Sequence, residues 1–331
     1  GVARQFLADE EWVSKMMDGK ENEIRPCICC HNGCFNMAHY KGVANDQDLS
    51  DALHMARCAI NAETMQTKIH HIVPTKKPKT VAIIGGGIGG METARVLKLR
   101  GHTPIIYEKN DHLGGTFIPA SKASFKGKLR GLEAWYELTI KNMGIEVHLN
   151  NEIKDISSIK ADAYVIATGS KARHFKIEGE EKAIDAIDYL NGAKVGNTVA
   201  VIGGGLTGCE IAYELSLEGK KPIIIEMKND LIAQKGVCLA NSSYLREYFA
   251  LAKVPVHLET KLTSIDDKEI TIEKLGSRPE KIPVDSVIMS VGYTPTPLVK
   301  KGKNVHLVGD CLTVGNLRTV IWRAYEVAMK I

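Results

Sequence analysis

The sequence predicts an α/β protein with two Rossmann-like dinucleotide-binding domains behind a short cysteine-rich segment, and three observations support this. An apolar run at residues 81–84 breaks into a glycine turn with G-x-G-x-x-G spacing, the same motif recurs 118 residues later, and four cysteines fall within residues 27–34. A single glycine motif is weak support, because α/β proteins also contain glycine turns that bind nothing. Two complete copies, each followed by a strand that ends in an acid, favour two dinucleotide sites.

The first motif has the pattern of a strand, a tight turn and a helix. Gly85 permits the sharp turn, Gly87 lets the backbone approach a pyrophosphate, and Gly90 lets the helix pack on the strand. The phosphates would lie at the helix N-terminus, where free N–H groups and the helix dipole favour anions. A second strand at residues 104–107 ends in Glu108, where a carboxylate can accept hydrogen bonds from a ribose.

The second motif repeats this layout with Gly203, Gly205 and Gly208, and its second strand ends in Glu226. A carboxylate at that position accepts the ribose hydroxyls of NADH and repels the 2′-phosphate of NADPH. Lys228 could offset this repulsion, but it begins a flexible polar turn, so we expect NADH to be preferred.

Composition excludes several classes of function. The 331 residues, 44% of them hydrophobic, suggest two or three domains with ordinary packed cores. The net charge of +4 is small and spread along the chain, which favours neither nucleic acid nor an anionic membrane as a partner. The sequence has no apolar run as long as a membrane span and no signal-peptide pattern. We expect a cytoplasmic protein with small-molecule partners, and a homo-oligomer stays open.

The cysteine cluster predicts a metal centre, because a disulfide scaffold would be unusual in a chain of this length. Cys27, Cys30 and Cys34 have C-x2-C-x3-C spacing, and Cys58 follows as a distal fourth thiol. A [4Fe–4S] cluster needs four such thiolates. Zinc also accepts four cysteines, but its usual pattern pairs two C-x2-C knuckles and only one is present. Reduced thiols without a metal are the remaining alternative.

The other thiols and the histidines of this region receive no ligand role. Cys29 could replace Cys30 only through a tighter loop, and His31 and His39 are expected to face solvent. The three remaining cysteines are scattered through the nucleotide-binding part and are expected to be small buried residues or surface thiols.

The sequence pattern also predicts the other helices, strands and turns. Residues 1–20 have amphipathic helical spacing, and residues 113–116 bring a second close approach of backbone through Gly115 and Thr116. Helices are expected at residues 128–143 and 317–329. Strands are expected at residues 145–149, 163–169, 286–292 and 305–310, with a meander of short strands near residues 256–258, 262–265 and 269–273.

The order of these motifs is similar to that of the flavoproteins with two dinucleotide-binding domains, in which FAD occupies the first unit and NAD(P)H the second. The resemblance implies that Ala167 and Gly169 line the FAD site, that Gly309 and Asp310 return to it with Asp310 on the ribityl chain, and that Gly292 belongs to the nucleotide side. It also implies a discontinuous FAD domain, residues 79–192 and 297–331, around an NAD(H) domain at residues 193–296.

The cysteine segment narrows the resemblance. Arg25-Pro26-Cys27, the C-x2-C-x3-C spacing and Cys58-x-x-Asn61 resemble the NADH:flavin oxidoreductases of the 2-enoate reductase, 2,4-dienoyl-CoA reductase and trimethylamine dehydrogenase type. These have an FMN-bearing TIM barrel, an iron–sulfur segment, and then FAD and nucleotide domains. Residues 1–78 would hold the end of the barrel and the [4Fe–4S] segment, and Arg4 matches a residue that holds the FMN phosphate.

The function implied by this resemblance is electron transfer from NADH to FAD, to the cluster and to FMN, in the service of reducing or desaturating an activated C=C bond. The 23 residues between Cys34 and Cys58 are about twice the gap expected in that family, so Cys58 departs from the pattern more than the other three ligands do. Most of the barrel is absent, and with it the acid that would protonate a substrate carbon, so no catalytic residue is assigned. A non-catalytic module that holds ADP or FAD is the alternative. A disulfide reductase is disfavoured, since neither nucleotide unit contains C-x2-C or C-x4-C.

Overall fold

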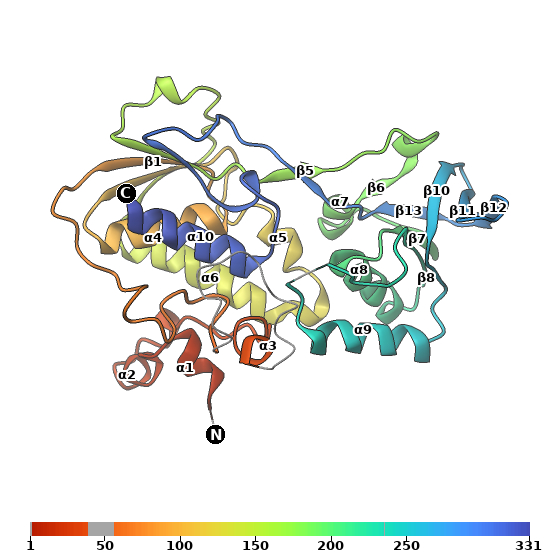
Figure 1. The fold of residues 1–331 in the computed structure, drawn as a ribbon, viewed down its shortest axis with the longest axis horizontal. Helices are drawn as coiled ribbons and strands as arrows, with labels where there is room; N and C mark the ends of the chain where they lie inside the picture. Colours follow the sequence, from red (N-terminus) through yellow and green to blue (C-terminus); the bar gives the residue numbers. More distant parts are fainter. Residues whose placement is uncertain (1, 39–55, 235) are drawn as a thin grey trace. The chain divides into compact units, whose positions relative to one another are not determined.

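A computed structural model describes residues 2–38, 56–234 and 236–331, so that His39 lies outside the described residues. The chain divides into two compact units (Figure 1). Unit 1 comprises residues 1–121, 126–171 and 294–331, and unit 2 comprises residues 122–125 and 172–293. The chain thus leaves unit 1 and returns to it.

Unit 1 is built on a five-stranded parallel sheet with the strand order β15-β4-β1-β2-β3. Four of the five residues of β1 are buried, which agrees with the continuous apolar run that a covered parallel strand requires. The strands are β1 (Thr80–Ile84), β2 (Thr103–Tyr107), β3 (Glu146–His148), β4 (Ala163–Ile166) and β15 (Val305–Leu307).

Three helices pack together in unit 1, beside the sheet (Figure 1). They are α4 (Ile88–Leu99), α6 (Gly127–Asn142) and α10 (Leu317–Lys330), with the short α5 (Phe117–Ala120) preceding α6. Their contact faces form one apolar core, in which Met91, Tyr136 and Trp322 are fully buried. The expected helices at residues 128–143 and 317–329 are therefore present, with ends shifted by one residue.

The N-terminal segment of unit 1 forms short helices rather than one amphipathic helix. These are α1 (Arg4–Ala8), α2 (Trp12–Met17), the 3₁₀ turn η1 (Glu21–Glu23) and α3 (Phe35–Ala38). The break after α1 is held by the buried carboxylate of Asp9, which accepts hydrogen bonds from Lys15 Nζ and from the amide of Arg25 at 2.7 and 2.8 Å. Trp135 of α6 donates a hydrogen bond to the carbonyl oxygen of Glu23, which fixes the segment on the core.

Unit 2 contains a second five-stranded parallel sheet, with the order β6-β13-β7-β8-β9, and a three-stranded antiparallel sheet, β10-β11-β12. Its helices are α7 (Ala186–Leu190), α8 (Leu206–Leu217) and α9 (Leu239–Leu251). The strands are β6 (Ile184–Asp185), β7 (Thr198–Ile202), β8 (Lys221–Ile225), β9 (Val256–His257), β10 (Thr260–Ile265), β11 (Glu269–Lys274), β12 (Glu280–Pro283) and β13 (Ser286–Met289). A two-stranded sheet pairs β5 (Ser170–Ala172) with β14 (Tyr293–Pro295).

The fold class is confirmed, and one detail of the strand prediction is wrong. Residues 256–257 do not join the meander, because the chain returns from α9 to run parallel to β8, with Ile224 beside Val256. The third strand of the antiparallel sheet is instead β12. Its sequence is mostly polar and has one partly buried apolar side chain, Ile282, so it lacks the alternation of apolar and polar residues that predicts a strand. In the described part of the chain, no helix is both long and apolar enough to cross a membrane.

Candidate functional site

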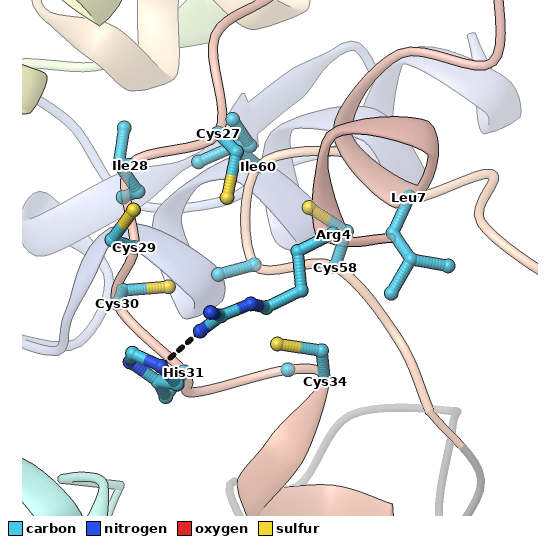
Figure 2. Close-up of a pocket in the computed structure, with 12 residues that line it drawn as sticks. Arg4, Leu7, Cys27, Ile28, Cys29, Cys30, His31, Cys34, Cys58 and Ile60 are labelled. Carbon is cyan, nitrogen blue, oxygen red and sulfur yellow. Dashed lines mark hydrogen bonds between the residues drawn. The ribbon is translucent and has the colours of Figure 1, made fainter. Parts of the chain in front are cut away.

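The four cysteines of the predicted metal site lie around one pocket in unit 1. Figure 2 shows the sulfur atoms of Cys27, Cys30, Cys34 and Cys58 directed toward a common space. Cys29 is exposed, and its sulfur lies outside this ring in the view of Figure 2. We call these four residues the cysteine ring.

Gly33 explains how the distal cysteine reaches the other three. A Cβ atom at Gly33 would lie 2.7 Å from the amide nitrogen of Ala59 and 2.8 Å from the carbonyl carbon of Cys58, so only glycine permits this approach. The amide of Arg57 donates a hydrogen bond to the carbonyl oxygen of Gly33 at 2.6 Å. The loop that carries Cys34 is thereby joined to the segment that carries Cys58.

Backbone amides surround the sulfur atoms of the ring. Burial raises the pKa of the Cys30 thiol to about 12, while a hydrogen bond from the Asn32 amide opposes the shift. Burial likewise raises the pKa of Cys58 to about 11, against hydrogen bonds from the amides of Ile60 and Asn61. Buried thiols that receive amide hydrogen bonds are suited to hold a cationic centre, which would stabilise the thiolates.

Arg4 and His31 close one side of the ring. Both residues line the pocket, and Arg4 Nη1 donates a hydrogen bond to His31 Nε2 (Figure 2). His31 was expected to face solvent, but it is half-buried because its backbone adopts a left-handed conformation that turns the ring toward α1. In this chain the Arg4 guanidinium therefore lies beside the cysteines.

The first glycine motif forms the turn between β1 and α4 in unit 1. Gly85 has φ of +111°, and a Cβ there would lie 2.3 Å from the carbonyl oxygen of Ala167. A Cβ at Gly90 would lie 2.0 Å from the oxygen of Gly85, so helix and strand pack without side chains between them. A Cβ at Gly87 would meet only the oxygen of Gly114, at 3.9 Å. The backbone at Gly87 is thus open to a phosphate group.

Glu108 is buried at the end of β2, with both oxygens directed by backbone. Its Oε2 accepts a hydrogen bond from the amide of Gly86 at 2.7 Å, and its Oε1 accepts one from Asn110 at 2.9 Å. Gly115 approaches Gly87, and Thr116 caps α5 beside it. This arrangement brings the predicted ribose acceptor and the second glycine turn to the same edge of the sheet.

The C-terminal part of unit 1 brings Gly309 and Asp310 to that edge. Asp310 Oδ1 accepts a hydrogen bond from the amide of Gly315 at 3.1 Å. Burial raises the pKa of Asp310, and hydrogen bonds from Gly315 and Ser170 oppose the shift. The predicted residue Gly169 follows β4, the strand that pairs with β15 just before Gly309.

The second glycine motif repeats this geometry in unit 2. A Cβ at Gly203 would lie 2.3 Å from the oxygen of Ser290, and one at Gly208 would lie 1.9 Å from the oxygen of Gly203. A Cβ at Gly205 would meet only the side-chain end of Gln234, at 3.7 Å. Glu226 Oε2 accepts a hydrogen bond from the amide of Gly204 at 2.6 Å. Gly292 follows β13, two residues after the strand contact at Ser290.

Sequence reasoning missed several residues of these sites. Gln234 beside Gly205 lies in a loop without a motif, and nothing in its sequence context indicates it. The amide donors around the cysteine ring depend on backbone conformation, which spacing does not encode. Trp322 of α10, which is buried and bonds to the Cys58 carbonyl oxygen, and the buried Arg318 one turn before it are predicted from the sequence only as parts of a helix.

Comparison with known proteins agrees with this geometry. The family model for pyridine nucleotide-disulphide oxidoreductases matches residues 79–321. The chain is 35% identical to cinnamate reductase from Clostridium sporogenes over its whole length, covering 49% of that protein. It is 30% identical to NADH oxidase from Thermoanaerobacter brockii, again over its whole length and covering 51% of the relative. The chain thus spans about half the length of the curated relatives it matches.

A solved structure is also similar to this chain along nearly its whole length. The structure of 2-naphthoyl-CoA reductase in complex with 2-naphthoyl-CoA superimposes with a TM-score of 0.87 and 26% identity, over 99% of this chain and 50% of that one. All eight cysteines of the chain are free, and Cys209, Cys238 and Cys311 are buried. The chain belongs to the pyridine nucleotide-disulphide oxidoreductase family, as the FAD- and NAD-binding part of an NADH:flavin oxidoreductase of the enoate reductase type.

Proposed function

We propose that this chain is the electron-input part of an NADH-dependent flavin oxidoreductase. Electrons pass from NADH to FAD, then to a [4Fe–4S] cluster, and on to FMN in a TIM barrel outside this chain. The complete protein then reduces, or in reverse desaturates, an activated C=C bond such as that of an enoate or an enoyl-CoA. The observation that carries the proposal is that unit 1 contains both the cysteine ring and a dinucleotide cradle.

The two glycine cradles fit two dinucleotides. FAD, when bound, accepts a hydride and releases its electrons singly. In unit 1 the open backbone at Gly87 would hold the pyrophosphate, Glu108 would accept a ribose hydroxyl, and Asp310 would accept a hydrogen bond from the ribityl chain. In unit 2, the backbone at Gly205 would hold the pyrophosphate of NADH, and Glu226 would accept hydrogen bonds from its ribose hydroxyls. We accordingly assign residues 79–192 and 297–331 to FAD and residues 193–296 to NADH.

The sequence spacing of the cysteine ring favours a cluster over a single zinc ion, because zinc sites usually pair two C-x2-C knuckles and only one is present. Tetrahedral zinc with Zn–S bonds of about 2.3 Å brings its sulfur atoms to within about 3.8 Å of one another. Among the described residues, no group of three or more cysteine, histidine or acidic side chains is placed to hold one ion. A four-iron cluster holds its thiolates farther apart, and hydrogen bonds to sulfur of the kind made by Asn32, Ile60 and Asn61 are among the features that set its potential.

The relatives indicate the class of substrate. Cinnamate reductase and 2-naphthoyl-CoA reductase are both named for an unsaturated carboxylic acid or its thioester. Because this chain covers about half of each, the substrate site and the FMN barrel are proposed to lie in the other half. Arg4, near the start of the chain, is the residue that we propose to face that domain.

The absorbance spectrum of protein purified without oxygen tests the proposal. Flavin absorption that NADH bleaches, together with about four iron atoms per chain, is expected if the chain is a flavin and cluster carrier. A chain that binds ADP and has no flavin would instead be a non-catalytic nucleotide-binding module, and the proposal would be wrong.

A further inference from the structure

Helix α10 contacts both proposed redox sites of unit 1. Val320 lies against the first nucleotide cradle, because Cβ atoms built at Gly89 and at Gly309 would lie 3.3 and 3.6 Å from Val320 Cγ1. Buried side chains of α10, among them Ile321 and Trp322, belong to the same apolar core against which Cys27, Cys30 and Cys58 pack. The helix is therefore a direct structural connection between the two sites.

Trp322 joins α10 to the cysteine ring. It is fully buried, and its Nε1 donates a hydrogen bond to the carbonyl oxygen of Cys58 at 2.9 Å. Its ring also contacts His70, with ring centroids 5.3 Å apart. The position of Cys58 is thus tied to the second turn of α10, 264 residues further along the chain.

Arg318 lies one turn before Trp322 and is 1% exposed. Its guanidinium carbon is 5.1 Å from the centroid of the Trp322 ring. Burial lowers the pKa of Arg318 to about 10, and its interaction with the Cys30 sulfur opposes this. An arginine guanidinium stays charged at pH 7 in proteins. Its contact with Trp322, which bonds to the Cys58 carbonyl oxygen, links this charge to the cysteine ring.

We propose that Arg318 is a redox-tuning residue whose buried positive charge raises the reduction potential of the cluster in the cysteine ring, with Trp322 fixing its place relative to Cys58. The inference rests on the proposed function. With both groups bound, this charge would favour transfer of one electron from a reduced flavin to the cluster, a step in which no bond forms or breaks. Positive charge stabilises the reduced cluster because that state carries one more negative charge.

The test is a redox titration of the cluster by electron paramagnetic resonance in the parent chain and four variants. Arg318→Gln removes the charge and keeps a polar side-chain end, whereas Arg318→Met removes both. Arg318→Lys retains the charge. As a control, Lys330→Gln removes one charge from the exposed end of the same helix. We expect both neutral variants to lower the equilibrium constant for cluster reduction about tenfold, a shift of about 59 mV for one electron. Arg318→Lys and Lys330→Gln should stay close to the parent chain.

Each other outcome overturns the inference. Unchanged potentials in the neutral variants, or an equal shift in Arg318→Lys, would mean that the charge does not act on the cluster. Loss of the cluster from both neutral variants would make Arg318 a requirement for assembly and not a tuning charge. Failure of the proposed function is distinct, because the parent chain itself would then contain no iron and give no cluster signal.

Discussion

Arg95 donates two hydrogen bonds to the carboxylate of Glu92, three residues earlier on α4, from Nε and Nη2 and each 2.8 Å long. Both side chains are buried, and Tyr136 Oη donates a third hydrogen bond to Glu92 at 3.2 Å. Arg95→Met would leave the carboxylate buried without its cation. We expect the free energy of unfolding to fall by about 3–5 kcal/mol, measured by urea denaturation followed by circular dichroism.

The matched control removes both charges. In Glu92→Gln combined with Arg95→Met no unpaired charge remains, so the double variant should be more stable than Arg95→Met alone. If the single variant lost less than about 1 kcal/mol, the pair would behave like an exposed ion pair and this reading of α4 would be wrong.

Gly33→Ala should disrupt the cysteine ring. The new methyl group would collide with backbone atoms of Cys58 and Ala59, which have no flexible end to move aside, at an expected cost of about 1–3 kcal/mol. We expect a lower iron content per chain, measured after reconstitution. Gly131→Ala is the control, because a Cβ there meets only Pro26 Cγ at 3.9 Å. Equal iron in both variants would contradict the prediction.

The cysteines themselves provide a sharper comparison. Cys30→Ala should lower the iron content, because Cys30 is half-buried in the ring and receives an amide hydrogen bond. Cys29→Ala should leave the iron content intact, because Cys29 is exposed and has φ of +54° at the edge of the loop. The opposite result would transfer the ligand role to Cys29.

Local pattern was sufficient to locate both nucleotide cradles. A glycine that must turn and an acid that ends the next strand are separated by one helix, so their spacing is short and repeats 118 residues later. The structure brings Gly85, Gly87 and Glu108 together at one edge of a sheet, as expected from that spacing. Their role in binding a cofactor stays a prediction.

The remaining features depend on contacts between distant parts of the chain. Cys58 meets the other cysteines only because Gly33 admits its backbone and Trp322 bonds to its carbonyl oxygen. Neither contact produces a periodic pattern in the sequence. From the sequence alone, Arg318 and Trp322 resemble ordinary residues of an amphipathic helix. The misplaced strand at residues 256–257 has the same cause, since its partner is decided by the return path of α9.

The division of labour between this chain and the rest of the protein can be tested directly. We expect the chain to reduce an artificial dye with NADH, because both nucleotide cradles are present within it. It should not reduce cinnamate or another enoate, because the proposed substrate site lies outside these residues. Turnover of an unsaturated acid by residues 1–331, followed by loss of its ultraviolet absorbance, would refute that division.

The choice between NADH and NADPH depends on Glu226 in unit 2. Its Oε2 accepts a hydrogen bond from the Gly204 amide at 2.6 Å and its Oε1 accepts one from the Lys228 amide at 2.8 Å. The carboxylate is therefore held by backbone on both sides, at the end of β8. The Lys228 side chain is exposed and can move, so it competes weakly for a 2′-phosphate.

We therefore expect NADH to be preferred and Glu226→Ala to relax the preference. Two like charges about 4 Å apart repel by about 1 kcal/mol in water, and more where they are partly desolvated, so the discrimination should be about tenfold or greater. The measurement is kcat/KM for each nucleotide with a dye as acceptor. Glu218→Ala, which removes an exposed carboxylate at the end of α8, should leave the ratio unchanged. A preference for NADPH, or an unchanged ratio in Glu226→Ala, would show that the carboxylate does not select the nucleotide.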